Sequence, residues 1–155
     1  MTDEAALKKA RFYVLKVLNA RPRSVEELTA KLREKGYPEE ITAQVIGECA
    51  KKGLLDDVKF AKLWVQGRMA SRPKGGAVLR RELEEKGVKE DVIEKVVAGV
   101  AKEYDEYEVA KGLAGQRIDR LKGLNKTTAK RRLFGFLRRR GFSFDTIIKV
   151  MDELL

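Results

Sequence analysis

The chain has 155 residues, 37% of them charged and 43% hydrophobic, which is apolar enough for a folded core. Lys and Arg total 34 against 24 Asp and Glu, and this formal charge of +10 favours a polyanionic partner. Histidine is absent and Cys49 is the single cysteine, which argues against zinc enzymes, triad hydrolases and disulfide scaffolds.

Residues 1–53 predict three helices. The first ends before Pro22, and its expected apolar face contains Leu7, Phe12, Leu15 and Leu18. Ser24 starts the second helix and forms a capping box with Glu27. The third helix has as its apolar positions Ile41, Val45, Ile46 and Cys49. On such a face, Cys49 is expected to be a small buried hydrophobe rather than a reactive thiol.

Residues 54–106 repeat this pattern. Asp56 and Asp57 precede an apolar helix, so we interpret them as N-capping residues rather than as a metal-binding pair. This helix ends before Pro73 and has as its apolar positions Phe60, Ala61, Trp64 and Val65. Trp64 is expected in the core, with a stacking platform for a base as the alternative. The last helix of the unit has as its apolar positions Val92, Ile93, Val96, Val97 and Val100.

Residues 107–155 form the third unit. Its first helix ends near Gly123 and contains Val109, Leu113, Ile118 and Leu121, and Thr127 is the expected cap of the next helix. Its last helix has as its apolar positions Ile147, Ile148, Met151, Leu154 and Leu155. No proline or clear cap interrupts residues 92–121, so either one long helix or two abutting helices could link the second and third units.

A shared motif relates the three units. Each has two leucines four residues apart, a glycine four residues after the second leucine, and an apolar residue after the glycine. The three glycines are Gly36, Gly87 and Gly141, and each is expected to end a helix in the left-handed conformation. No segment predicts a strand. The sequence therefore predicts an all-α, elongated tandem array of three three-helix repeats, 1–53, 54–106 and 107–155.

Positive charge gathers in one stretch of each unit. The three units carry net charges of +3, 0 and +7. Long stretches without an acidic residue lie between Glu4 and Glu26, between Asp57 and Glu82, and between Asp119 and Asp145. Aligned on the glycines, these stretches overlap, so stacked repeats could form one basic stripe suited to phosphates or an acidic groove. The alternative is three separately solvated basic faces. The residues that we predict to bind a partner are Arg68, Arg72, Lys74, Arg80, Arg81, Lys126, Lys130, Arg131, Arg132, Arg138, Arg139 and Arg140.

The loop at residues 72–76 is the most conspicuous break between helices. One proline and two glycines predict a loop, and loops on rigid scaffolds often bind partners. The glycines of Lys74-Gly75-Gly76 lack the rest of a phosphate-binding loop, so no ATPase site is expected.

The first two units resemble the RecX family of recombinase regulators. The resemblance is carried by Gly53-Leu54-Leu55-Asp56-Asp57 with Phe60-Ala61, Trp64-Val65 and Arg68, and by Pro22-Arg23-Ser24 with Glu27-Leu28 and Lys35-Gly36-Tyr37. The third unit matches more loosely, because basic residues replace the acidic ones beside Leu137. The resemblance implies tandem three-helix repeats and binding in the groove of the RecA–DNA filament. It also implies inhibition of recombinase ATPase, strand exchange and repressor co-cleavage.

No catalytic residue, cofactor or metal site is implied by the resemblance or found in the sequence. The alternative function is direct binding to DNA through helix-turn-helix-like units. Asp3 and Glu4 stand where a signal peptide would carry lysines, and no apolar run reaches the ~18 residues that span a bilayer. We therefore expect a cytoplasmic, monomeric protein without membrane contact.

Overall fold

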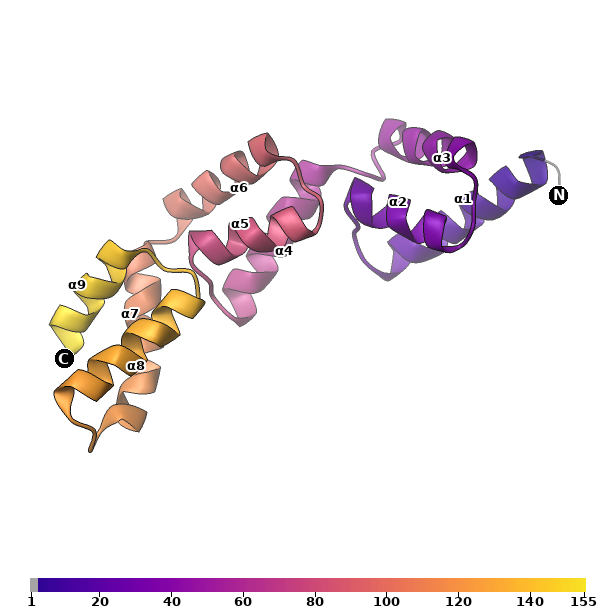
Figure 1. The fold of residues 1–155 in the computed structure, drawn as a ribbon. Helices are drawn as coiled ribbons and strands as arrows, with labels where there is room; N and C mark the ends of the chain where they lie inside the picture. Colours follow the sequence, from indigo (N-terminus) through magenta and orange to yellow (C-terminus); the bar gives the residue numbers. More distant parts are fainter. Residues whose placement is uncertain (1–2) are drawn as a thin grey trace.

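Short amphipathic helices make up almost all of the fold. The structure is a computed structural model that describes residues 3–155 (Figure 1). Within this range the helices are α1 (Asp3–Ala20), α2 (Val25–Glu34), α3 (Glu39–Lys51), α4 (Asp57–Ser71), α5 (Gly76–Glu85), α6 (Glu90–Glu103), α7 (Glu106–Ile118), a 3₁₀ turn (Asp119–Leu121), α8 (Lys126–Arg139) and α9 (Phe144–Leu154). The all-α prediction is confirmed.

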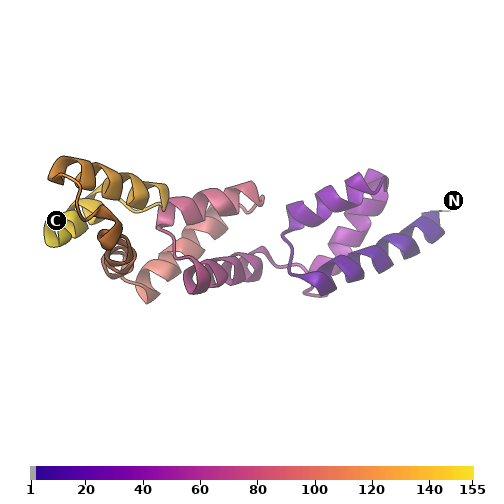
Figure 2. The same cartoon turned by 90° about the horizontal axis from the view of Figure 1, so that it is seen from below.

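The helices form three successive triplets, each around its own core. In every triplet the third helix packs against both the first and the second, as α3 does against α1 and α2. The predicted leucine pairs lie in these cores, for example Leu28 and Leu32, each with 0% exposure. Figures 1 and 2 show the triplets following one another in an elongated array, with the chain termini at opposite ends. The predicted tandem array of three-helix repeats is therefore confirmed.

Helix ends follow the predicted chemistry at most positions. The Ser24 hydroxyl accepts a hydrogen bond from the Glu27 amide, and the Glu27 carboxylate accepts one from the Ser24 amide, which completes the capping box. Gly36, Gly87 and Gly141 have φ angles of 91°, 79° and 94°. A residue with a Cβ is strained there, so the sequence motif marks true left-handed helix ends.

The apolar face of α1 differs from the prediction. Ala10 and Val14 are buried at 0% and 1% exposure, whereas Phe12 and Leu15 are 74% and 55% exposed. The small side chain of Ala10 allows α1 to approach its neighbours closely, so the face through Ala10 and Val14 enters the core. The expectation that Phe12 and Leu15 belong to the core is wrong.

Two further expectations about helix ends are settled by the structure. Asn125, not Thr127, caps α8: its side-chain oxygen accepts from the Thr128 amide at 2.8 Å, and Thr127 lies within the first turn. Between the second and third triplets, α6 and α7 are separate helices. Tyr104 is extended at the end of α6, and Asp105 caps α7 by accepting from the Glu108 amide. The alternative of one long helix is therefore wrong.

The middle helices of the three repeats follow one another in a row. Figure 2 shows α8, α5 and α2 along one edge of the array. At both junctions, the residue that caps the start of one middle helix donates to the carbonyl at the end of the next repeat's middle helix. The Gly75 amide donates to Arg140 at 2.7 Å, and the Ser24 hydroxyl donates to Lys86 at 2.6 Å. The positive N-terminal end of one helix dipole therefore lies against the negative C-terminal end of the next, and the two ends attract each other.

Polar side chains dominate the junction between the first two repeats. Glu27 of α2 contacts Lys86 at 3.4 Å and Arg21 at 2.8 Å. The Asp57 carboxylate, at the start of α4, accepts a hydrogen bond from the Val25 amide at 3.0 Å. The first repeat thus contacts the second through the buried Ser24 and through the charged side chains of Glu27, Lys86 and Asp57.

Backbone and apolar groups dominate the junction between the second and third repeats. The Ala77 amide donates to Gly141 at 3.3 Å, beside the Gly75–Arg140 hydrogen bond. A Cβ on Gly75 would collide with the Gly141 carbonyl, and one on Gly141 would lie 2.6 Å from the Val78 amide nitrogen. Both glycines are required because two helix ends touch there.

Candidate functional site

Positive side chains converge where the second and third repeats touch. The loop between α4 and α5 carries Arg72 and Lys74, and the Gly75–Arg140 hydrogen bond brings the end of α8 against this loop. Lys74 and Arg140 are half-buried, and Arg72 is exposed. We call Arg72, Lys74 and Arg140 the junction cluster.

The charges of the junction cluster repel one another. Burial lowers the pKa of Lys74, and the neighbouring charges of Arg140, Arg68 and Arg72 lower it further, whereas Glu82 opposes this shift. Burial also lowers the pKa of Arg140, with Arg72 and Arg117 adding to the effect. Because partly buried cations that lie close together repel one another, binding an anion between them is favourable.

Phe136 contacts the guanidinium group of Arg140 from the junction cluster and that of the neighbouring Arg117. The Cζ of Arg117 lies 4.2 Å from the centre of the Phe136 ring, and that of Arg140 lies 5.1 Å from it. Both distances fall within the range of cation–π attraction. The contact positions the two arginines on the third repeat without neutralising their charge.

A hollow lined by arginines continues from Phe136 across the third repeat. It has a volume of about 530 Å³, and its apolar lining residues include Leu121, Leu133 and Phe136. The arginines that line it come from α7, the 3₁₀ turn and α8: Arg117, Arg120, Arg131, Arg132 and Arg139. No carboxylate lines this hollow within the described part of the chain. Such a surface can bind phosphates or carboxylates.

The predicted residues divide into paired and unpaired cations. Arg68 forms an ion pair with Glu82, and Arg80 forms one with Glu94. Arg138 forms no ion pair among residues 3–155, but it donates a hydrogen bond to the Phe142 carbonyl at 3.3 Å. Among residues 3–155, no ion pair involves the other predicted residues, which are Arg72, Lys74, Arg81, Lys126, Lys130, Arg131, Arg132, Arg139 and Arg140. These unpaired cations retain charge for a partner.

Two residues of this surface were missed by the sequence prediction. Arg117 precedes Asp119 and so falls outside the acid-free stretch, and Arg120 was inside it but not assigned to the site. Arg117 lies in the last turn of α7 and Arg120 in the 3₁₀ turn that follows, and both line the hollow. Arginines at i and i+3 near a predicted helix end are the signal that could have identified them.

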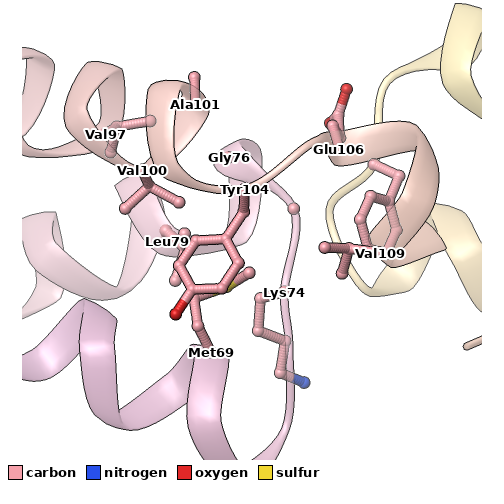
Figure 3. A pocket seen from close by; sticks show the side chains of 12 residues that line it. Met69, Lys74, Gly76, Leu79, Val97, Val100, Ala101, Tyr104, Glu106 and Val109 are labelled. Atoms are coloured by element: carbon pink, nitrogen blue, oxygen red, sulfur yellow. The ribbon is translucent and has the colours of Figure 1, made fainter. Parts of the chain in front are cut away.

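A small apolar pocket separates the cores of the second and third repeats. Its volume is about 190 Å³, below the ~300 Å³ at which ligand pockets begin. Figure 3 shows the Tyr104 ring lying across it near Leu79 and Met69, with the Lys74 side chain beside the ring. The pocket thus places Lys74 at the edge of an apolar joint rather than in a cofactor site.

Other singled-out residues have structural roles. Asp56 caps α4 by accepting from the Val58 and Lys59 amides, as predicted, while Asp57 instead bonds to Val25 in the first repeat. Cys49 is 6% exposed, and burial raises the pKa of its thiol. Trp64 is partly buried, and it packs against the core of the second repeat, where it stacks on Phe60. Arg68 and Lys86 lie about 5 Å from its ring centre.

Neither a cluster of metal ligands nor a membrane-spanning helix occurs among the described residues. No three Cys, Asp or Glu side chains within residues 3–155 are grouped so that they could hold a metal ion. In the same range, every helix is too short or too polar to cross a bilayer.

Comparisons with known proteins agree with this architecture. Models of the first, second and third three-helix domains of RecX match residues 10–49, 56–97 and 103–151. Regulatory protein RecX of Amycolatopsis mediterranei (strain U-32) is 35% identical, over 100% of this chain and 88% of that protein. The homologue of the same name from Mycobacterium avium (strain 104) is 38% identical, over 92% and 83%.

Solved structures show the same fold. The crystal structure of RecX from Lactobacillus salivarius matches with a TM-score of 0.86, 23% identity and 97% coverage of both chains. A second crystal structure, of a regulatory protein RecX, matches with a TM-score of 0.86 and 24% identity, over 97% of this chain and 73% of that one. With three domain models matched in order along its length, the chain belongs to the RecX family.

Proposed function

We propose that this protein is a non-enzymatic regulator that binds the RecA–DNA filament in its groove and inhibits recombinase ATPase, strand exchange and co-cleavage. Membership of a family whose relatives are named regulatory proteins supports a regulatory role. The elongated array supports binding along a filament rather than within a pocket. In this proposal the protein acts in the cytoplasm as a monomer.

The junction cluster is the observation on which the proposal chiefly depends. Its cations repel one another in the free protein, and no carboxylate pairs with them within residues 3–155. A phosphate or an acidic side chain of the filament would relieve this repulsion on binding, so the complex is favoured over the free state. The arginine-lined hollow extends the same contact over the third repeat.

The mechanism follows from occupancy. A protein lying in the filament groove would hinder the movements of neighbouring recombinase protomers that accompany ATP hydrolysis. It would also exclude a second DNA strand from the groove. Because no catalytic group is needed, inhibition should depend on the amount of protein bound relative to filament. It should fall as salt screens the cationic contacts.

An ATPase assay of a RecA-type recombinase on single-stranded DNA tests the proposal. We expect the wild-type protein to inhibit hydrolysis, and the triple variant Arg72→Gln, Lys74→Gln and Arg140→Gln to require about ten-fold more protein for half inhibition. Glutamine keeps much of each side-chain stem and removes the charge. Circular dichroism should show unchanged helix content.

The matched control changes the charge equally at α6. The variant Lys89→Gln, Lys95→Gln and Lys102→Gln removes three exposed lysines that form no ion pair within the described chain. It should inhibit like the wild type. Equal loss in both variants would mean that net charge, rather than the junction cluster, sets the inhibition, and equal inhibition by all three proteins would refute the site.

Direct DNA binding remains the second candidate, and the arginine-lined hollow favours it. Five duplex phosphate contacts would give a log–log salt slope on the order of −4. A slope of this size on bare duplex, with no gain in affinity when the recombinase is added, would support direct DNA binding. A shallow slope on bare DNA with tight filament binding would support the regulator.

A further inference from the structure

The first repeat exposes an aromatic and basic surface that the proposed function does not use. Phe12 is 74% exposed, the highest value among the large exposed hydrophobic side chains of residues 3–155. It lines a shallow hollow with the partly buried Tyr13 and Tyr37, whose ring centres are 6.5 Å apart. Phe12 therefore presents most of its ring to solvent beside two further rings.

Lysines surround these rings. The rest of the hollow is formed by Lys8, Lys9, Lys16 and Lys35, and no acidic residue of the described chain lines it. None of the four forms an ion pair within residues 3–155. Lys35 Nζ lies 5.1 Å from the centre of the Tyr13 ring. The positive charge is thus held over aromatic faces and is free for an anion.

The spacing along α1 sets the geometry of this surface. Lys8 and Lys16 lie four residues before and after Phe12, so all three share one helical face. Arg11, on the same helix, instead forms an ion pair with Glu48 of α3 at 2.6 Å. Arg11 therefore stabilises the fold, whereas the lysines of α1 around the exposed Phe12 ring form no ion pair within residues 3–155.

A ligand for this surface must carry both negative charge and flat aromatic groups. Single-stranded nucleic acid has both, because its phosphates suit lysines and its unpaired bases stack on aromatic side chains. In a duplex the base faces are already stacked and could not reach Phe12. An acidic peptide would satisfy the lysines but would leave Phe12 without a flat partner.

We propose that the first repeat binds single-stranded nucleic acid, with a base stacked on Phe12 and the flanking phosphates bound by Lys8 and Lys16. Eight residues of helix place the backbones of Lys8 and Lys16 about 12 Å apart, one on each side of Phe12. Their long side chains can therefore reach phosphates on both sides of the stacked base. The surface shares no residue with the junction cluster or with the arginine-lined hollow. It therefore goes beyond the proposed function and does not require a recombinase.

Fluorescence anisotropy with two oligonucleotides tests the proposal. One is a fifteen-residue oligothymidine, and the other is a strand of equal length in which every position is abasic. All variants are made in the Arg72→Gln, Lys74→Gln and Arg140→Gln background, so that the second surface contributes less. Phe12→Ala is expected to weaken oligothymidine binding about ten-fold, with little change for the abasic strand.

Two further variants report on the aromatic and charged parts separately. Phe12→Trp should restore or exceed wild-type affinity for oligothymidine, because tryptophan also offers a stacking face. Lys8→Gln with Lys16→Gln should weaken both strands alike and reduce the salt slope by about 1.4. Because Phe12 and these lysines are exposed, the helix content should not change.

Phe144→Ala is the matched control. Phe144 is the other exposed phenylalanine among the described residues, at 58%, and lies on the third repeat. Its removal should leave oligothymidine affinity unchanged. Equal affinity of Phe12→Ala and its parent, or equal loss on both strands, would overturn the proposal.

Recombinase binding separates this surface from the proposed function. If Phe12→Ala lowers affinity for DNA-free recombinase but not for oligothymidine, the surface is a protein-docking site and the nucleic-acid proposal is wrong. If oligothymidine binding depends on Phe12 while ATPase inhibition does not, the nucleic-acid proposal holds whether or not the filament proposal does.

Discussion

The two junctions between repeats have the same geometry and different chemistry. In each, the start of one middle helix meets the end of the next repeat's middle helix. Between the first two repeats the contact is made by the Ser24 hydroxyl and by charges around Glu27. Between the last two it is made by the backbones of Gly75 and Gly141, next to an apolar pocket.

This difference separates mechanical from functional roles. At the polar junction, opposite charges form ion pairs within the protein, so they are not available to a partner. The apolar junction is held by backbone contacts and packing, which need no charge, and like charges gather at its edge. A repeat protein can thus keep one docking geometry while it reserves the cations of one junction for a partner.

The largest expected effect is at Gly141. Gly141→Ala places a Cβ in a left-handed residue and against Val78, so we expect a loss of about 3 kcal/mol in the free energy of unfolding. Gly36→Ala has a similar φ, but nothing lies within 4 Å of its Cβ, so the loss should be about 1 kcal/mol. Urea denaturation measures both. Equal losses would show that backbone strain alone, without the junction contact, sets the cost.

The polar junction should respond less strongly. Ser24→Ala removes a helix cap and the hydrogen bond to Lys86, and we expect a loss of about 2 kcal/mol. Asn125→Ala removes only a cap, because Asn125 makes no junction contact, and should cost about 1 kcal/mol. The difference between the two variants in urea denaturation reports the junction. No difference would mean that the Ser24–Lys86 hydrogen bond contributes nothing.

Local sequence signals foretold the parts of the fold that short segments determine. The leucine spacing, the glycines and the Ser24–Glu27 box each involve residues within about ten positions, and all three appear as predicted. The buried face of α1 was missed because alanine gives a weak hydrophobic signal and Phe12 a strong one. At Asn125 and Thr127, two good capping residues stood two positions apart.

The site was less predictable, because its character depends on contacts between repeats. Two predicted arginines form ion pairs with carboxylates on other helices, Arg68 with Glu82 and Arg80 with Glu94. In each pair the two residues are fourteen positions apart in the sequence. The approach of Arg140 to Lys74 depends on the Gly75–Arg140 hydrogen bond, which links two repeats. An acid-free stretch indicates where charge is plentiful, but only packing decides which cations stay unpaired.

The pH dependence of the polar junction is a smaller effect. Burial raises the pKa of Glu27, but hydrogen bonds from Arg21 and Ser24 and the charges of Arg21 and Lys86 outweigh this and lower it overall. Stability from the ionised carboxylate is therefore present above the unfolded pKa of about 4.3 and is lost as pH falls through the lower folded value. At pH 7, Glu27→Gln should cost on the order of 1 kcal/mol.

That cost should shrink as the pH is lowered from 7 to about 3, because the wild-type carboxyl then also becomes neutral. Glu39→Gln is the control, since Glu39 is an exposed carboxylate bonded to Arg33 within the first repeat. It should change stability little at either pH. Urea denaturation at both pH values gives the comparison, and a pH-independent cost of Glu27→Gln would contradict the assigned role of its charge.

The smallest expected effect has the opposite sign and lies at the apolar junction. Lys74→Gln removes one of the mutually repelling cations, so the free energy of unfolding should rise by a few tenths of a kcal/mol at low salt. Urea denaturation at about 20 mM and about 500 mM salt measures the gain, which screening should reduce. Lys102→Gln, which changes an exposed lysine of α6, should give no such gain. A loss of stability in Lys74→Gln would mean that the ammonium supports the fold, whereas a gain accompanied by weaker recombinase inhibition would show that the protein keeps this charge for its partner at the expense of its own stability.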